Sequence, residues 1–239
     1  MAERFLIVNA DDFGQSDGIN TGVITSHDRG IVTSASLMVR WPAAVEAARL
    51  ASTRPALALG LHVDLAQWTF AGDEWRPDYE VVGVDDAAAV EGEVGRQLDI
   101  FRALVGVPPT HLDGHQHVQR SDPVGAVLRD AGAALGVPVR LHSRVRYCGS
   151  FYGQTGKGGA HPAGITVAGL LAAVDGTGEG WTELGCHPGL DDDAPSSYRV
   201  ERRVEVATLC EPAVRAELSE RDVVLRSFAE VPPAIASRG

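Results

Sequence analysis

Residues 4–14, RFLIVNADDFG, set a pattern that the rest of the chain repeats. The apolar run predicts a buried strand, and Asp11 and Asp12 follow where that strand ends. Residues 18–29 come next, with apolar side chains at helical spacing, and predict an amphipathic helix. A buried strand followed by a helix is the repeating unit of a parallel β/α fold, so this stretch already indicates the fold class.

The alternation continues along the chain. Further strands are predicted at residues 31–39, 56–65, 110–115, 137–142, 181–189 and 223–228. Helices are predicted at residues 42–52, 85–106, 123–136 and 165–174, with one or two more around 203–218. This order predicts an α/β fold of mostly parallel strands, arranged as a distorted or incomplete (β/α) barrel. No composition break marks a second domain, so residues 1–239 are expected to form one domain.

Composition and charge narrow the function. Apolar residues make up 44% of the chain, charged residues 22%, and the net charge is −11. This balance is typical of a folded globular protein and disfavours nucleic acid as a partner. The three cysteines have no C-x-x-C spacing, and the apolar run before Asp11 is too short for a signal peptide. No run approaches the ~20 residues of a membrane span, so we expect a cytoplasmic protein without a membrane partner.

Polar residues that can carry chemistry recur where predicted strands end. Carboxyl ends of parallel strands converge on one face of a β/α fold, where barrel enzymes carry their sites. Two histidines plus one carboxylate form a known ligand set for catalytic metals, and a neighbouring carboxylate can act as a base. A metal-dependent hydrolase is therefore predicted. The candidate residues are Asp11, Asp12, His62, His187 and the histidines of HLDGHQH, residues 111–117.

Structural readings compete with this one. An Asp-Asp pair at a strand end is more often a helix cap or turn former, and a single strand histidine is usually structural. Convergence of several such residues at four strand ends favours a site. A serine hydrolase is disfavoured because G-x-S-x-G is absent from the sequence, and Cys186 cannot pair with its strand neighbour His187. Residues 153–159, GQTGKGG, lack the spacing of a phosphate-binding P-loop.

Five segments together resemble the YdjC-like carbohydrate deacetylases, which include chitooligosaccharide and hopanoid-associated deacetylases. They are LIVNADDFG (6–14), GIVTSASLMV (30–39), ALGLHVDL (58–65), PTHLDGHQHV (109–118) and TELGCHPG (182–189). The resemblance covers nearly the full chain. It implies a distorted β/α barrel and an enzyme that hydrolyses the acetamide of an N-acetylated small-molecule sugar.

The resemblance also implies roles for single residues. The family's metal ligands fall on Asp12, His62 and His115. Asp11 matches the position of the general base, and His187 matches the histidine expected to act as an acid or to steady the oxyanion. Magnesium is the ion usually assigned to this family, although two imidazoles suit zinc at least as well.

The remaining histidines of HLDGHQHVQ, residues 111–119, are assigned by their place along the chain. His111 lies back in the strand and is expected to be structural, whereas His117 is expected near the substrate. The residues that can offer a stacking face to a sugar, or serve equally in the core or an interface, are Trp41, Trp68, Trp75, Phe151 and Tyr152. Of these, Phe151 and Tyr152 are the candidate substrate-binding residues. Gln119 stands where many relatives have a further histidine, which could alter substrate choice if it lines the site.

Three functions remain open on the sequence alone. The first is a metal-dependent N-deacetylase, and the second is a phosphoester hydrolase on the same scaffold. A second metal would need Asp64 and Asp113, which are more readily explained as partners that orient the histidines. The third is a non-catalytic sugar-binding protein. Residues 69–80, TFAGDEWRPDYE, are interpreted as a lid or a dimer contact, so a homodimer is possible, and the Gly-rich residues 148–164 as a functional or mobile loop.

Overall fold

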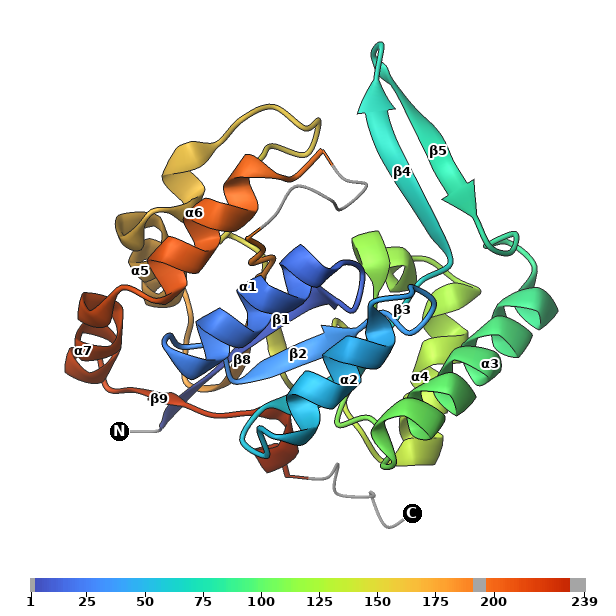
Figure 1. Ribbon diagram of the computed structural model, residues 1–239, viewed down its shortest axis with the longest axis horizontal. Coiled ribbons are helices and arrows are strands. Elements are labelled where there is room, and N and C mark those ends of the chain that lie inside the picture. The colour runs from blue at the N-terminus through green and yellow to red at the C-terminus, as the bar shows by residue number, and fades with distance from the viewer. Residues whose placement is uncertain (1–2, 191–196, 233–239) are drawn as a thin grey trace.

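A curled, mostly parallel sheet forms the centre of the protein, and helices pack around it (Figure 1). The computed structural model describes residues 3–190 and 197–232. The sheet has the strand order β6-β3-β2-β1-β8-β7, with β9 beside β1. Its strands are β1 (Arg4–Phe13), β2 (Ser34–Leu37), β3 (Ala58–Val63), β6 (Leu112–Gly114), β7 (Arg146–Cys148), β8 (Gly180–Cys186) and β9 (Val223–Leu225). The predicted α/β fold with an incomplete barrel is confirmed.

The helices lie where the sequence places them, within a few residues. They are α1 (Asp17–Asp28), α2 (Ala44–Ser52), α3 (Ala87–Val105), α4 (Val124–Leu135), α5 (Val167–Asp175), α6 (Val200–Leu209) and α7 (Pro212–Glu220). The side chain of Ser16 accepts a hydrogen bond from the backbone of Ile19 and so caps α1. Gly106 ends α3 with a left-handed φ of 82°, which glycine adopts without strain. The main core lies between the sheet and these helices.

Strand β1 lies in the middle of the sheet and carries the first two candidate site residues, Asp11 and Asp12. It pairs in parallel with β8 from Arg4 to Ala10, and its second half pairs with β2. The register with β2 shifts between Ala10 and Phe13, and Asp12 has a left-handed φ of 64°. This irregularity matters because neighbours on a regular strand point to opposite faces.

Two parts of the fold differ from the sequence prediction. Residues 137–142 do not form the expected strand: Val139 makes one bridge to Leu112, Pro138 has no N–H to donate, and Leu141 turns the chain with a φ of 68°. Val139 lies at the β6 edge of the sheet. The opposite edge is formed by β7, which pairs with β8 and ends at Cys148, the first residue of the segment predicted as irregular.

A hairpin of β4 (Ala66–Ala71) and β5 (Glu74–Glu80) was not predicted as strands. It projects away from the body of the protein (Figure 1). Residues 74–80, EWRPDYE, do alternate ring-bearing and charged side chains, but the run is mostly exposed and contains Pro77, which argues against a strand in the sequence. In the described part of the chain, none of the helices is long and apolar enough to cross a membrane.

Candidate metal and active site

The three residues assigned as metal ligands meet at the carboxyl ends of their strands. Asp12 ends β1, His62 lies in β3, and His115 begins the 3₁₀ turn that follows β6. Oδ1 of Asp12 lies 3.0 Å from Nδ1 of His115 and 3.4 Å from Nε2 of His62. All three are buried, and their candidate ligand atoms lie within 4.8 Å of one another. One carboxylate oxygen and two imidazoles at this spacing fit a divalent cation.

His62 is oriented by a second carboxylate. Its Nδ1 lies 2.7 Å from Oδ1 of Asp113, which leaves Nε2 on the side of Asp12. A carboxylate behind a histidine ligand fixes the tautomer and the ring orientation in metal sites. Burial disfavours the charged ring, but Asp113 and Asp11 outweigh it and hold the pKa of His62 well above its usual value.

A second set of potential ligands, Asp11, His62 and Asp113, is equally compact. Both of its carboxylates are already paired with one buried guanidinium, that of Arg140. Arg140 donates to both oxygens of Asp11 at 2.7 Å, and its Nη2 lies 2.8 Å from Asp113. Asp12 also pairs with a guanidinium, that of Arg202, but only through Oδ2, so its Oδ1 still faces both histidines. The set that contains Asp12 is therefore the better candidate for the metal.

Arg140 is the centre of a buried charge cluster. Besides the two aspartates it contacts Glu183 of β8, and it lies 4.8 Å from the ring centre of Tyr147. Burial raises the pKa of Asp11, but pairing with Arg140 outweighs it, so the net shift is downward and Asp11 stays ionised at neutral pH. Burial dominates at Glu183 and raises its pKa to about 7.

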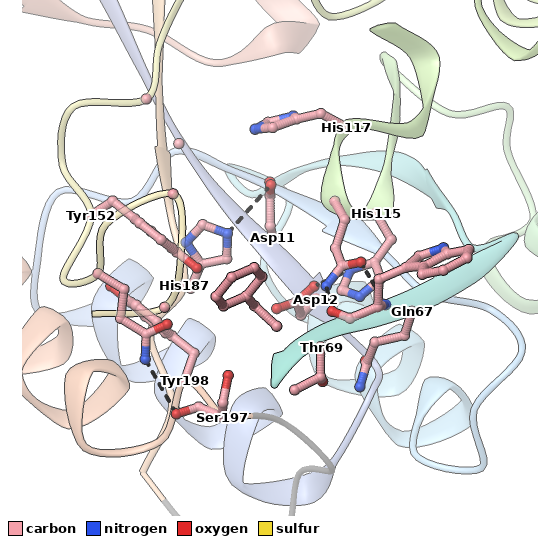
Figure 2. Close-up of a pocket in the computed structure, with 18 of the residues that line it drawn as sticks. Asp11, Asp12, Gln67, Thr69, His115, His117, Tyr152, His187, Ser197 and Tyr198 are labelled. Atoms are coloured by element: carbon pink, nitrogen blue, oxygen red, sulfur yellow. Dashed lines mark hydrogen bonds and ion pairs between the residues drawn. The ribbon is translucent and has the colours of Figure 1, made fainter. Parts of the chain in front are cut away.

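His187 lies beside Asp11 at the end of β8. Its Nε2 is 3.8 Å from Oδ2 of Asp11, and the ring packs edge-on against Tyr152 and Tyr198. Burial lowers the pKa of His187 to about 4, so the imidazole is neutral at pH 7. Figure 2 shows this contact, with Asp12 and His115 close by.

Helix α6 supports both halves of the site. Arg202 donates to Oδ2 of Asp12 at 2.6 Å, and it also donates to the backbone oxygens of Tyr198 and His187. Glu205 accepts hydrogen bonds from the backbone N–H of His187 and the hydroxyl of Tyr198. Burial raises the pKa of Glu205 to about 8. Helix α6 therefore connects Asp12, near the end of β1, to His187, which follows the neighbouring strand β8.

The site opens into a cavity of about 610 Å³. All eight residues that the sequence assigned to the site line it: Asp11, Asp12, His62, His115, His117, Phe151, Tyr152 and His187. Their individual roles stay predictions. Phe151 is only 1% exposed and belongs to the core, so most of its ring packs inward.

His117 reaches the cavity through an unusual turn. Gln116 and His117 both have left-handed backbones, with φ of 50° and 57°. The ring of His117 packs edge-on against Tyr147, and its Nε2 lies 3.3 Å from the tyrosine hydroxyl. Burial lowers the pKa of His117 to about 4, so this ring too is neutral.

Other polar residues of the motifs lie away from the cavity. His111 stacks on Phe228 with 3.8 Å between ring centres and contacts Ser36, as a structural residue does. Asp113 contacts His62, as expected for a residue that orients a histidine. Asp64 instead accepts hydrogen bonds from Arg40, Trp41 and Tyr79, the last of which belongs to the β4–β5 hairpin. Gln119 is fully buried next to Gly114 and is not part of the cavity lining.

The sequence reasoning missed Arg140, Glu183, Arg202 and Glu205. The available signal was a charged residue inside an apolar segment, as in VPVRLH (137–142) and WTELGC (181–186). Such a charge is almost never buried without a partner. Spacing along the chain does not reveal which partner it meets.

The family model for YdjC-like proteins matches residues 5–220. The chain belongs to the YdjC-like family. It is 33% identical to a carbohydrate deacetylase from Geobacillus stearothermophilus, over 95% of this chain and 98% of that protein. It is 31% identical to a chitooligosaccharide deacetylase from Serratia marcescens, over 96% of this chain and all of that protein.

Two solved structures share this fold. An Enterococcus faecalis protein with the provisional name "cellobiose-phosphate cleavage protein" superposes with a TM-score of 0.77 at 24% identity, covering 95% of this chain and 98% of its own. A family 4 acetyl xylan esterase from Clostridium thermocellum, solved with a cobalt ion, gives a TM-score of 0.55 at 12% identity, with 95% and 89% covered. Both show the likeness of the fold.

Proposed function

We propose that this protein is a metal-dependent hydrolase that removes the acetyl group from an N-acetylated amino sugar or a sugar-containing metabolite. The observation that carries the proposal is the meeting of Asp12, His62 and His115 with Asp11 and His187 in one cavity. The two relatives named as deacetylases support the same reaction, since they match along nearly the whole chain.

Asp12, His62 and His115 would hold the ion. Oδ1 of Asp12 contacts both histidines, and Asp113 fixes the ring of His62, as expected for ligands of a metal. A bound divalent ion would lower the pKa of a water molecule and polarise the acetyl carbonyl. We assign magnesium by the family resemblance, and zinc as the alternative that suits two imidazoles.

Asp11 and His187 would transfer a proton from the attacking water to the leaving amine. Arg140 keeps Asp11 ionised, so its carboxylate can accept a proton from the attacking water. The water oxygen bonds to the carbonyl carbon, the C–N bond breaks, and the proton ends on the departing amine. His187 is neutral and lies 3.8 Å from Oδ2 of Asp11, so it would accept this proton from Asp11 and pass it to the amine nitrogen. His117, Tyr152 and Phe151, which line the same cavity, would contact the sugar.

The test is acetate release from N-acetylated mono- and oligosaccharides, with phosphate esters run in parallel. We expect acetate release that chelation abolishes and added metal restores, and we expect His115→Ala to lose both the metal and the activity. Full activity in metal-free protein would contradict the proposal. Release of phosphate alone would favour the phosphoesterase alternative, and sugar binding without turnover at saturating metal would favour a binding protein.

A further inference from the structure

The β4–β5 hairpin has two chemically different faces. The cross-strand pairs Trp68–Pro77 and Phe70–Trp75 put aromatic rings and a proline on one face. On the other face, Gln67 and Thr69 both donate to the carboxylate of Asp78. The polar face is thus satisfied within the hairpin, whereas Trp75 on the apolar face is 53% exposed.

The base of the hairpin is held firmly against the body. The side-chain amide of Gln116 pairs with the backbone N–H and C=O of Trp68, at 2.8 and 2.9 Å. The hydroxyl of Tyr79 donates to the buried Asp64 at 2.7 Å. Gln116 directly follows the metal-site residue His115, so the hairpin is fixed to the loop that carries this ligand. A two-stranded hairpin is marginal alone, and these anchors make it a wall of the site.

The aromatic rings belong to the same cavity as the metal site. Trp68, Phe70 and Trp75 line it together with Asp12, His62 and His115. Gln67 and Thr69 of the polar face line it as well (Figure 2), so polar groups lie beside the rings. Phe70 and Trp75 meet edge-on with 5.5 Å between ring centres, and Nζ of Lys157, from the Gly-rich loop, lies 5.8 Å from the ring centre of Phe70. A cavity of about 610 Å³ takes more than one sugar ring.

We propose that Trp68, Phe70 and Trp75 form a second sugar subsite, which binds the ring linked to the N-acetylated one and determines the length of the substrate. This inference rests on the proposed function. The C–H face of a pyranose packs on aromatic rings, and its hydroxyls need hydrogen-bond partners at the edge. Lys157, the only lysine in the chain, places an ammonium donor beside the stacking face.

The experiment compares N-acetylglucosamine with its β-1,4-linked disaccharide as substrates of the metal-loaded protein. The wild type should prefer the disaccharide by about tenfold or more in kcat/KM, because stacking adds binding energy. Phe70→Ala and Trp75→Ala should lose about tenfold on the disaccharide, mainly through KM, and leave the monosaccharide unchanged. Arg76→Ala is the matched control and should change neither, because Arg76 is exposed, pairs with Glu74 and is not among the residues that line the cavity.

Equal use of both sugars by the wild type would overturn the subsite, as would an equal loss on both substrates in the variants. Disaccharide binding to the metal-free protein, measured by calorimetry, separates this inference from the proposed function. If no acetate is released from any sugar, the proposed function fails, yet Trp75→Ala should still weaken disaccharide binding about tenfold. Unchanged binding would refute the subsite. If the wild type is a dimer in solution and Trp75→Ala is a monomer, the apolar face of the hairpin is an interface between two copies of the chain and the subsite is refuted.

Discussion

The guanidinium of Arg202 lies 2.6 Å from Oδ2 of Asp12, while Oδ1 of the same carboxylate contacts the two histidines. Both partners of this ion pair are buried. Burial raises the pKa of Asp12, but Arg202 and the histidines outweigh it and hold the pKa well below its usual value. Arg202 at Oδ2 and the proposed cation at Oδ1 would thus both stabilise the ionised form of Asp12.

Arg202→Met should lower the free energy of unfolding of the metal-free protein by about 3–5 kcal/mol, because it leaves a buried carboxylate without its partner. The loss should be smaller in metal-loaded protein, since the cation supplies positive charge to Asp12. Denaturant unfolding with and without metal measures both values. Arg29→Met, at an exposed position just after helix α1, is the control. An equal loss in the two states would show that Arg202 acts only through packing.

Metal uptake at pH 7 should release about one proton, because His62 is protonated in metal-free protein and must be neutral to bind a cation. Calorimetry in two buffers of different ionisation enthalpy counts the protons. The raised pKa of His62 also determines how the free energy of unfolding of the metal-free protein changes with pH. The contribution of His62 to metal-free protein is complete below its unfolded pKa and is lost as the pH rises through the folded pKa. Metal binding without proton release at pH 7 would refute this assignment.

Asp11→Asn should lower kcat by about 100- to 10,000-fold, the usual contribution of a general base, and leave metal affinity nearly unchanged. The asparagine is isosteric and keeps an oxygen that accepts from Arg140. Steady-state kinetics and a metal titration on the same preparation check the two parts. If the variant loses the metal as well, the ion belongs to the alternative set of Asp11, His62 and Asp113.

Gly60→Ala should destabilise the protein by about 1–3 kcal/mol, because its Cβ would overpack a filled core. That Cβ would lie 2.4 Å from ring atoms of His111, which is held between Ser36 and Phe228. Gly92→Ala, in helix α3 with nothing within 4 Å of the new Cβ, should instead stabilise by about 0.5–1 kcal/mol. Thermal unfolding of both variants measures these changes in stability. If Gly60→Ala is as stable as the wild type, His111 can move aside to make room for the new Cβ.

Much of the fold could be read from local pattern. Short apolar segments alternate with longer amphipathic ones, and this alternation predicts strand β1, helix α3 and the parallel direction of the strands. Gly106 marks the end of α3. The β4–β5 hairpin and β7 could not be read in this way. The hairpin strand β5 is mostly exposed and contains Pro77, which argues against a strand, and β7 is too short to give a periodic signal.

The sequence by itself determined which side chains gather at the cavity, because carboxyl ends of parallel strands must share one face. Asp11, Asp12, His62, His115 and His187 all lie there. Only the tertiary structure decided which charged partners these residues meet. Arg140 pairs with Asp11 from 129 positions away and Arg202 pairs with Asp12 from 190 positions away. Pairings of this kind depend on how distant segments pack, to within an ångström, and no local periodicity encodes that distance.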